Sequence, residues 1–70
     1  MDFKNEGILK LNNNGRYEVN GFEFSCGTPF EIELNGVFVP TSMEFSDGCQ
    51  FGYYATGLIG LRLQGKKVRF

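Results

Sequence analysis

Three Asn-Gly dipeptides punctuate this chain of 70 residues, at Asn14-Gly15, Asn20-Gly21 and Asn35-Gly36. Asn and Gly are the residues that most readily adopt positive φ at both central positions of a type I′ turn, whose twist matches that of the flanking strands. The second and third dipeptides each lie between short runs in which apolar and polar residues alternate, as they do in a half-buried strand. The sequence therefore predicts β-hairpins and an all-β fold.

The turn at Asn35-Gly36 fixes the register of the clearest hairpin, because a two-residue loop decides which residues lie opposite one another. The strands on either side run from Phe30 to Leu34 and from Val37 to Phe45. The inward pairs are then Leu34 with Val37, Ile32 with Val39 and Phe30 with Thr41, and the outward pairs are Glu33 with Phe38 and Glu31 with Pro40. We therefore expect Phe38 to be exposed on the outer side of the sheet.

The turn at Asn20-Gly21 predicts a second hairpin, between residues 16–19 and 22–25. Alternate residues of both strands share an inner face, and these are Tyr17, Val19, Phe22 and Phe24. Glu18 lies opposite Glu23 on the other face, where two like charges are tolerable only if solvent or a nearby cation surrounds them.

The rest of the chain predicts further strands and no long helix. Strands are expected over 7–11, over 49–55 after a turn at 46–48, and over the alternating tail 61–70. The strand at 49–55 would bring Cys49, Phe51 and Tyr53 into the core, and at most one short 3₁₀ turn is expected at 57–61. About five to seven short antiparallel strands in a single domain, residues 1–70, favour a small, SH3-like, partly open barrel.

The composition argues against catalysis. The chain has no histidine, which is the side chain that most often serves as a general base near neutral pH. The carboxylates of Glu31, Glu33 and Glu44 follow the spacing of a solvated strand face, and a small barrel has little room for an apolar pocket that would raise a carboxyl pKa. We therefore expect a non-enzymatic protein with no catalytic residues, no cofactor and no metal.

The two cysteines and the amino terminus indicate a cellular location. Cys26 and Cys49 lack metal-ligand spacing, so we expect two buried free thiols in a reducing compartment. The first residues are polar and do not form the apolar segment of a signal peptide. No apolar run approaches the ~20 residues of a membrane-spanning helix. We therefore expect a cytoplasmic protein without a membrane partner.

Several short motifs together resemble an uncharacterised family, classed as a domain of unknown function, of small proteins from Gram-positive bacteria and their mobile elements. The motifs are Gly7-Ile8-Leu9, Gly15-Arg16-Tyr17, Ser25-Cys26-Gly27, the run from Phe30 to Thr41, Gly52-Tyr53-Tyr54 and the ending from Leu63 to Phe70. The resemblance implies an accessory protein of a phage, plasmid or transposon that modulates a host system, as an anti-defence protein does.

The residue pattern favours recognition of a host protein through the meander face. Phe38 and Tyr54 are expected on adjacent strands, across the pair of Pro40 with Tyr54, as an aromatic pair flanked by Glu31 and Glu33. Rings supply flat contact area and carboxylates meet Lys or Arg of a partner. The alternative is that the amino-terminal hairpin covers Phe38. An exposed sheet edge beside an aromatic face is also compatible with a homodimer.

A second binding hypothesis is capture of nucleic acid or of a nucleotide ligand. It rests on the cations near the end of the chain, Arg62, Lys66, Lys67 and Arg69. Small barrels hold single strands with such cations and with stacked aromatic rings. The net charge of -1 provides no overall attraction for a polyanion, which weighs against strong non-specific binding.

Overall fold

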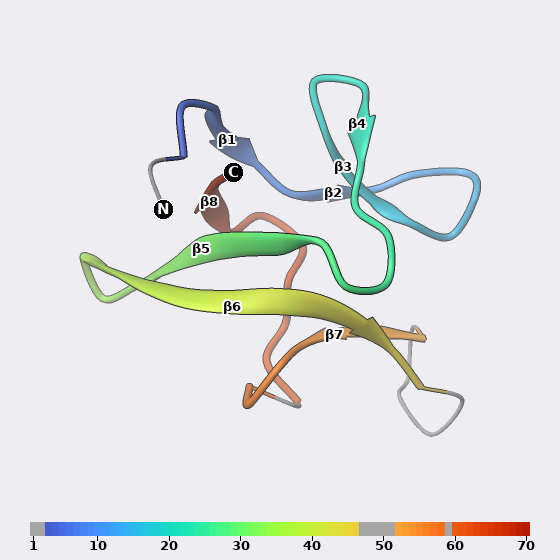
Figure 1. Cartoon of the computed structure of the whole chain (residues 1–70). Helices are drawn as coiled ribbons and strands as arrows, with labels where there is room; N and C mark the ends of the chain where they lie inside the picture. The colour runs from blue at the N-terminus through green and yellow to red at the C-terminus, as the bar shows by residue number, and fades with distance from the viewer. Residues whose placement is uncertain (1–2, 47–51, 59) are drawn as a thin grey trace.

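The computed structural model describes residues 3–46, 52–58 and 60–70, and within them the chain is entirely β (Figure 1). The eight strands are β1 (Glu6–Ile8), β2 (Lys10–Leu11), β3 (Tyr17–Val19), β4 (Phe22–Glu23), β5 (Pro29–Leu34), β6 (Val37–Phe45), β7 (Tyr53–Ala55) and β8 (Lys67–Arg69). All paired strands are antiparallel, which confirms the predicted fold class. The described residues contain no helix suited to crossing a membrane.

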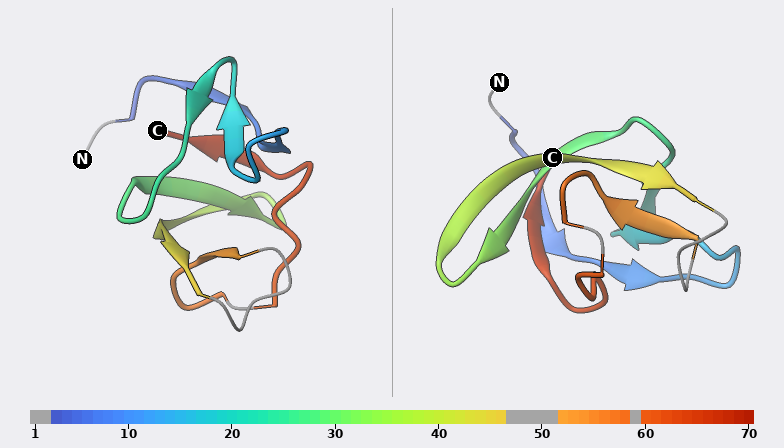
Figure 2. Two further views of the ribbon diagram at one scale, coloured as in Figure 1. Left: turned by 90° about the vertical axis from the view of Figure 1, so that its right-hand side faces the viewer. Right: turned by 90° about the horizontal axis from the view of Figure 1, so that it is seen from below.

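The strands form a five-stranded sheet, in the order β1-β8-β5-β6-β7, and a three-stranded sheet, in the order β2-β3-β4. One stretch of chain belongs to both sheets, because β1 pairs with β8 and β2 pairs with β3. Figure 2 shows β1 and β2 following one another along this stretch. Leu9, at the change of sheet, is fully buried, and this change of partner divides the single first strand that the sequence predicted. The shared strand joins the two sheets around one core.

The core lies between the two sheets. Phe24, which directly follows β4, contacts Phe30 of the large sheet edge to face, with ring centroids 5.2 Å apart. The buried apolar side chains are Leu9, Tyr17, Val19, Phe24, Phe30, Ile32, Met43, Ala55, Leu63 and Val68. Phe22 was predicted to be inside and is 47% exposed. It belongs to β4, an edge strand, and its ring contacts Phe70 at 5.0 Å and Phe24 at 5.3 Å between ring centroids.

The hairpin registers follow the Asn-Gly dipeptides. Asn20 and Asn35 have positive φ, at 49° and 53°, and each is followed by a glycine that also has positive φ. The five predicted pairs between β5 and β6 are all present. Val37 is the exception to the predicted burial, with 62% exposure, because the end of this hairpin extends beyond the core. Asn14-Gly15 differs, since only the glycine has positive φ there.

A carboxyl-terminal strand is present, but it covers only Lys67–Arg69 of the predicted 61–70 and lies inside the large sheet rather than at its end. Strand β8 lies between β1 and β5 and brings Val68 into the core. Before it, hydrogen bonds run from Leu58 N to the Ala55 carbonyl and from Leu61 N to the Leu58 carbonyl, and the described residues of this segment form turns and contain no helix. The predictions for Cys49 and Phe51 lie outside the described residues, whereas Tyr53 packs against the core as expected.

Candidate protein-binding face

The outward side chains of four neighbouring strands form a continuous surface, which we call the outer face. Alternation along each strand places Val68 and Ile32 in the core and their neighbours on the opposite side. The outer face consists of Glu6 and Ile8 from β1, Lys67 and Arg69 from β8, Glu31 and Glu33 from β5, and Phe38 and Pro40 from β6. It therefore contains three of the four predicted partner-binding residues.

The cations of the outer face share one carboxylate. Lys67 Nζ lies 2.9 Å from Glu6 Oε1, and Arg69 Nε lies 3.4 Å from Glu6 Oε2. The hydrogen bond from Lys67 is the main cause that lowers the pKa of Glu6, and the charge of Lys67 and the contact with Arg69 add to it, against desolvation, which raises the pKa. The same bond raises the pKa of Lys67, to which the charge of Glu33 contributes. Glu6 thus draws both cations towards β1.

Arg69 also covers Phe38. Its guanidinium carbon lies 3.6 Å from the centroid of the Phe38 ring. Strand β5 lies between β8 and β6, so the Arg69 side chain crosses β5, whose outward residues are Glu31 and Glu33. The prediction that Phe38 is exposed is therefore wrong in degree, because the ring is on the outer face but half-buried. Its cover is a cation from β8 rather than the amino-terminal hairpin, and exposed contacts of this kind contribute about 0.5–1 kcal/mol.

The two carboxylates beside this stack have no direct partner. Glu31 and Glu33 are half-buried. Neither side chain forms a hydrogen bond or ion pair with any residue that the structure describes. Each ionised carboxylate can accept several hydrogen bonds. Their oxygens are therefore available to donors from another molecule, although Arg69 and Lys67 lie close by.

Tyr54 does not join Phe38. The turn predicted at 46–48 would place Tyr54 opposite Pro40, whereas the structure pairs Tyr54 with Glu44. The hydrogen bond from Ser46 N to the Gly52 carbonyl, at 2.7 Å, continues this register. Glu44 and Phe38 lie six residues apart on β6, which is about 20 Å at a rise of roughly 3.3 Å per residue. The predicted aromatic pair is therefore wrong, and Tyr54 lies outside the candidate site.

The four cations of the nucleic-acid hypothesis do not form one stripe. Lys67 and Arg69 lie on the outer face and are engaged by Glu6. Lys66 is half-buried before β8, where its carbonyl accepts a hydrogen bond from Leu9 N. Arg62 acts on another part of the molecule, where its charge partly offsets the burial that raises the pKa of Tyr17. The four cations are close in the sequence, but the fold places them on different parts of the molecule.

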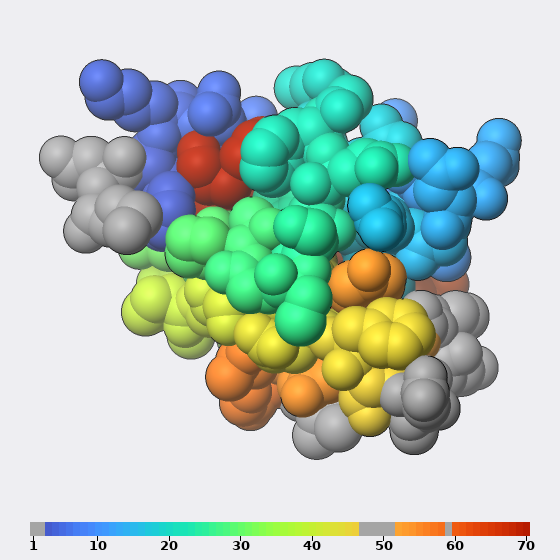
Figure 3. Space-filling model, turned by 45° about the vertical axis from the view of Figure 1, so that its right-hand side comes forward, coloured from blue at the N-terminus to red at the C-terminus, as the bar shows by residue number. Residues whose placement is uncertain are grey.

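Cys26 contradicts the expectation of a buried thiol. The turn at 25–28 lies against β6 (Figure 3), where Gly27 N donates to the Met43 carbonyl at 2.7 Å. This contact leaves the Cys26 side chain outside, and its Sγ donates to Glu44 Oε1 at 3.3 Å. Cys49 lies outside the described residues. No group of His, Cys, Asp or Glu within the described part of the chain has the arrangement of a metal site.

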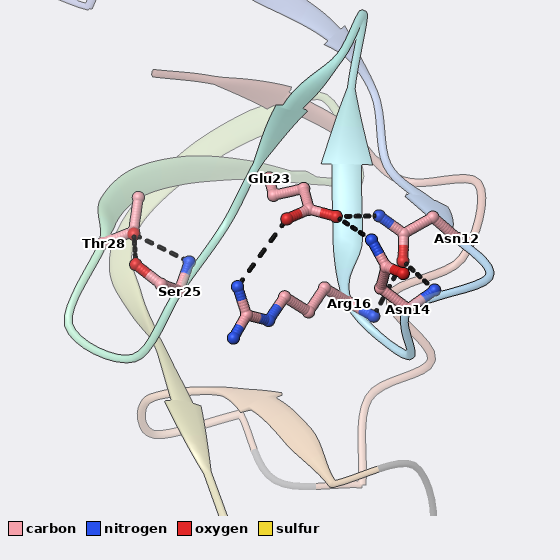
Figure 4. Close-up of polar contacts among 6 residues, drawn as sticks. All are labelled: Asn12, Asn14, Arg16, Glu23, Ser25 and Thr28. Carbon is pink, nitrogen blue, oxygen red and sulfur yellow. Dashed lines mark hydrogen bonds and ion pairs between the residues drawn. The ribbon is translucent and has the colours of Figure 1, made fainter.

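A polar cluster on the small sheet was not foreseen (Figure 4). Glu23 Oε2 accepts hydrogen bonds from Asn12 Nδ2 at 2.7 Å and Asn14 Nδ2 at 2.9 Å, and Arg16 lies 3.6 Å from Oε1. These donors lower the pKa of Glu23, Asn14 most strongly. They also explain how Glu23 tolerates Glu18 directly opposite on β3. The signal in the sequence was the run of asparagines before Arg16, which read only as a turn.

Comparison with known protein families assigns the chain to one of them. The model of a family described as a domain of unknown function, DUF5348, matches residues 7–70. The chain belongs to this family. The family match begins within β1 and includes every residue of the outer face except Glu6. No protein with a curated description matches the chain.

A solved structure is similar to this family member. It is a crystal structure of a protein from Ruminococcus gnavus, a target of the Northeast Structural Genomics Consortium, with 30% sequence identity and a TM-score of 0.78. The match covers 94% of this chain and 100% of the other. The likeness supports the two-sheet fold and assigns no activity.

Proposed function

We propose that this DUF5348 chain is a non-enzymatic module that binds a host protein through the outer face of its large sheet. The observation that carries the proposal is the pair of carboxylates, Glu31 and Glu33, which lie beside Phe38 without a hydrogen bond or ion pair to any described residue. Half-buried charges without partners favour a complementary surface that brings its own donors. The partner surface is therefore basic.

The nucleic-acid alternative has less support. Binding of a phosphate backbone needs several cations on one surface. Each contact between a cation and a phosphate releases counterions and so adds to the affinity. Two of the four candidate cations share the Glu6 carboxylate, and Arg62 acts near Tyr17 instead. The outer face carries three carboxylates against two cations, so its field opposes a polyanion.

The biological setting is part of the same proposal. We infer that the protein acts in the cytoplasm, as an accessory protein of a phage or other mobile element in a Gram-positive host, and that its target belongs to a host system such as defence. The resemblance to proteins of this origin supports that setting. An SH3-like barrel, as expected from the sequence, would fit the binding role, because small barrels of that kind recognise peptides and proteins.

Capture from a Gram-positive lysate tests the proposal. Immobilised wild-type protein, the E31Q/E33Q double variant and the control E18Q are compared, with bound proteins identified by mass spectrometry. Glu18 also lies on a strand face but belongs to the small sheet. We expect a partner that wild type and E18Q retain and that E31Q/E33Q loses. Equal retention by all three would show that the outer face is not the binding surface.

A further inference from the structure

Arg69 occupies the outer face in the way a partner's arginine would. Its guanidinium lies 3.6 Å from the Phe38 ring centroid, after crossing the strand that carries Glu31 and Glu33. A planar cation over an aromatic ring, with carboxylates beside it, is a favourable environment for a guanidinium. In this chain the ligand of that environment comes from the chain itself.

The strand pairing of β8 does not depend on the contact between Arg69 and Phe38. Arg69 is 43% exposed in its side chain, and its backbone is held between β1 and β5 by strand pairing. Glu6 lies on the other side of β8 from Phe38 and already accepts Arg69 Nε. A side chain that left Phe38 would therefore keep a carboxylate partner. In the structure Arg69 makes both contacts at once, and a ligand that binds only when the Phe38 ring is uncovered would shift the population towards a side chain held by Glu6 alone.

We propose that Phe38, Glu31 and Glu33 form a binding site for an arginine side chain of the partner, and that Arg69 fills this site in the free protein. Arg69 then acts as an internal competitor, which a partner must displace towards Glu6. This inference deepens the proposed function and depends on it for its biological meaning. It names the chemistry of the ligand as a guanidinium on a basic segment, in preference to the compact ammonium of lysine.

A single-arginine peptide, acetyl-Gly-Arg-Gly-amide, tests the site directly. Its binding to wild type, R69Q and the matched control K67Q is followed by NMR titration. Lys67 lies on the same strand and shares Glu6, but among the described cations it is Arg69 that lies over the Phe38 ring. We expect R69Q to bind about tenfold more tightly than wild type, because a site that is mostly self-occupied loses apparent affinity in proportion. K67Q is expected to stay within about twofold of wild type, since its site remains filled.

Two further measurements separate recognition from general charge effects. The lysine peptide acetyl-Gly-Lys-Gly-amide should gain less from R69Q, and F38L added to R69Q should remove the gain. Equal gains for R69Q and K67Q, or no gain in a folded R69Q, would overturn the inference. If R69Q fails to fold, R69K keeps the charge near Glu6 but loses the planar stack, and the same gain is expected from it. These peptides need no host partner, so failure here is distinguishable from failure of the lysate experiment.

Discussion

The two sheets use glutamate in opposite ways. On the small sheet, Glu23 accepts hydrogen bonds from Asn12 and Asn14 and lies 3.6 Å from the Arg16 guanidinium. On the large sheet, Glu31 and Glu33 have no hydrogen bond or ion pair within the described residues. A carboxylate whose oxygens are filled by its own chain fixes local structure. One whose oxygens are open, beside an aromatic ring, is available for recognition.

The difference arises from where the donors lie. Asn12 Oδ1 accepts hydrogen bonds from Asn14 N and Arg16 N, so the turn is organised around one amide and delivers its donors to β4. The donors near Glu31 and Glu33 are on β8, and Glu6 already engages them. Local sequence thus satisfies the first carboxylate, whereas long-range strand order leaves the other two open.

The largest effect is expected at Gly7, where β1 of the large sheet contacts β3 of the small sheet. A methyl group on this residue would collide with the Val19 side chain of β3, and the φ of Gly7 is not in the positive range. The obstacle is therefore steric. Overpacking of a core typically costs about 1–3 kcal/mol, so we expect G7A to lower the free energy of unfolding by that amount.

The G7A prediction is measured by urea denaturation, with V19A as its companion. Val19→Ala alone creates a void and should also destabilise the protein. The double variant G7A/V19A should be more stable than the sum of the two single changes, because the smaller side chain makes room for the added methyl group. Strict additivity would mean that the two sheets do not meet at this contact.

The fold was more predictable than the site. Asn35-Gly36 determines a local register, so the pairs of β5 with β6 followed from the sequence alone. The place of β8 between β1 and β5 depends on pairing across nearly the whole chain, and no dipeptide encodes it. The contact of Arg69 with Phe38 depends on this strand order, so it could not be predicted from the sequence. Tyr54 was misplaced because β7 pairs with β6 in a register four residues away from the one that the predicted turn implied.

A smaller effect is expected from E23Q, which keeps the shape of the side chain and removes its charge. Donors lower the pKa of Glu23 in the folded state, from a reference value of 4.5. A depressed carboxyl pKa stabilises the fold above the unfolded-state pKa, and this contribution disappears as the pH falls through the folded-state pKa. We expect E23Q to melt at a lower temperature than wild type at pH 7.

The pH dependence of that difference is the decisive readout for E23Q. The two melting temperatures should converge as the pH falls through the lowered folded-state pKa of Glu23, where the carboxylate of the wild type becomes protonated. The matched variant E33Q, from the large sheet, should have the same melting temperature as wild type at pH 7. The substitution removes no hydrogen bond within the described residues. A destabilised E33Q would show that the two sheets use their carboxylates alike.

The smallest effect is expected from nucleic acid. We predict that a single-stranded oligonucleotide binds too weakly to measure by fluorescence anisotropy, even at low salt, because Glu6 engages Lys67 and Arg69. The variant E6Q sharpens this test. It releases both cations and reduces the acidity of the outer face, so any binding should first emerge there and should weaken as salt is added. Salt-dependent binding by the wild type would instead favour the cations of the carboxyl-terminal strand as the functional residues, and the open carboxylates of β5 would then have another explanation.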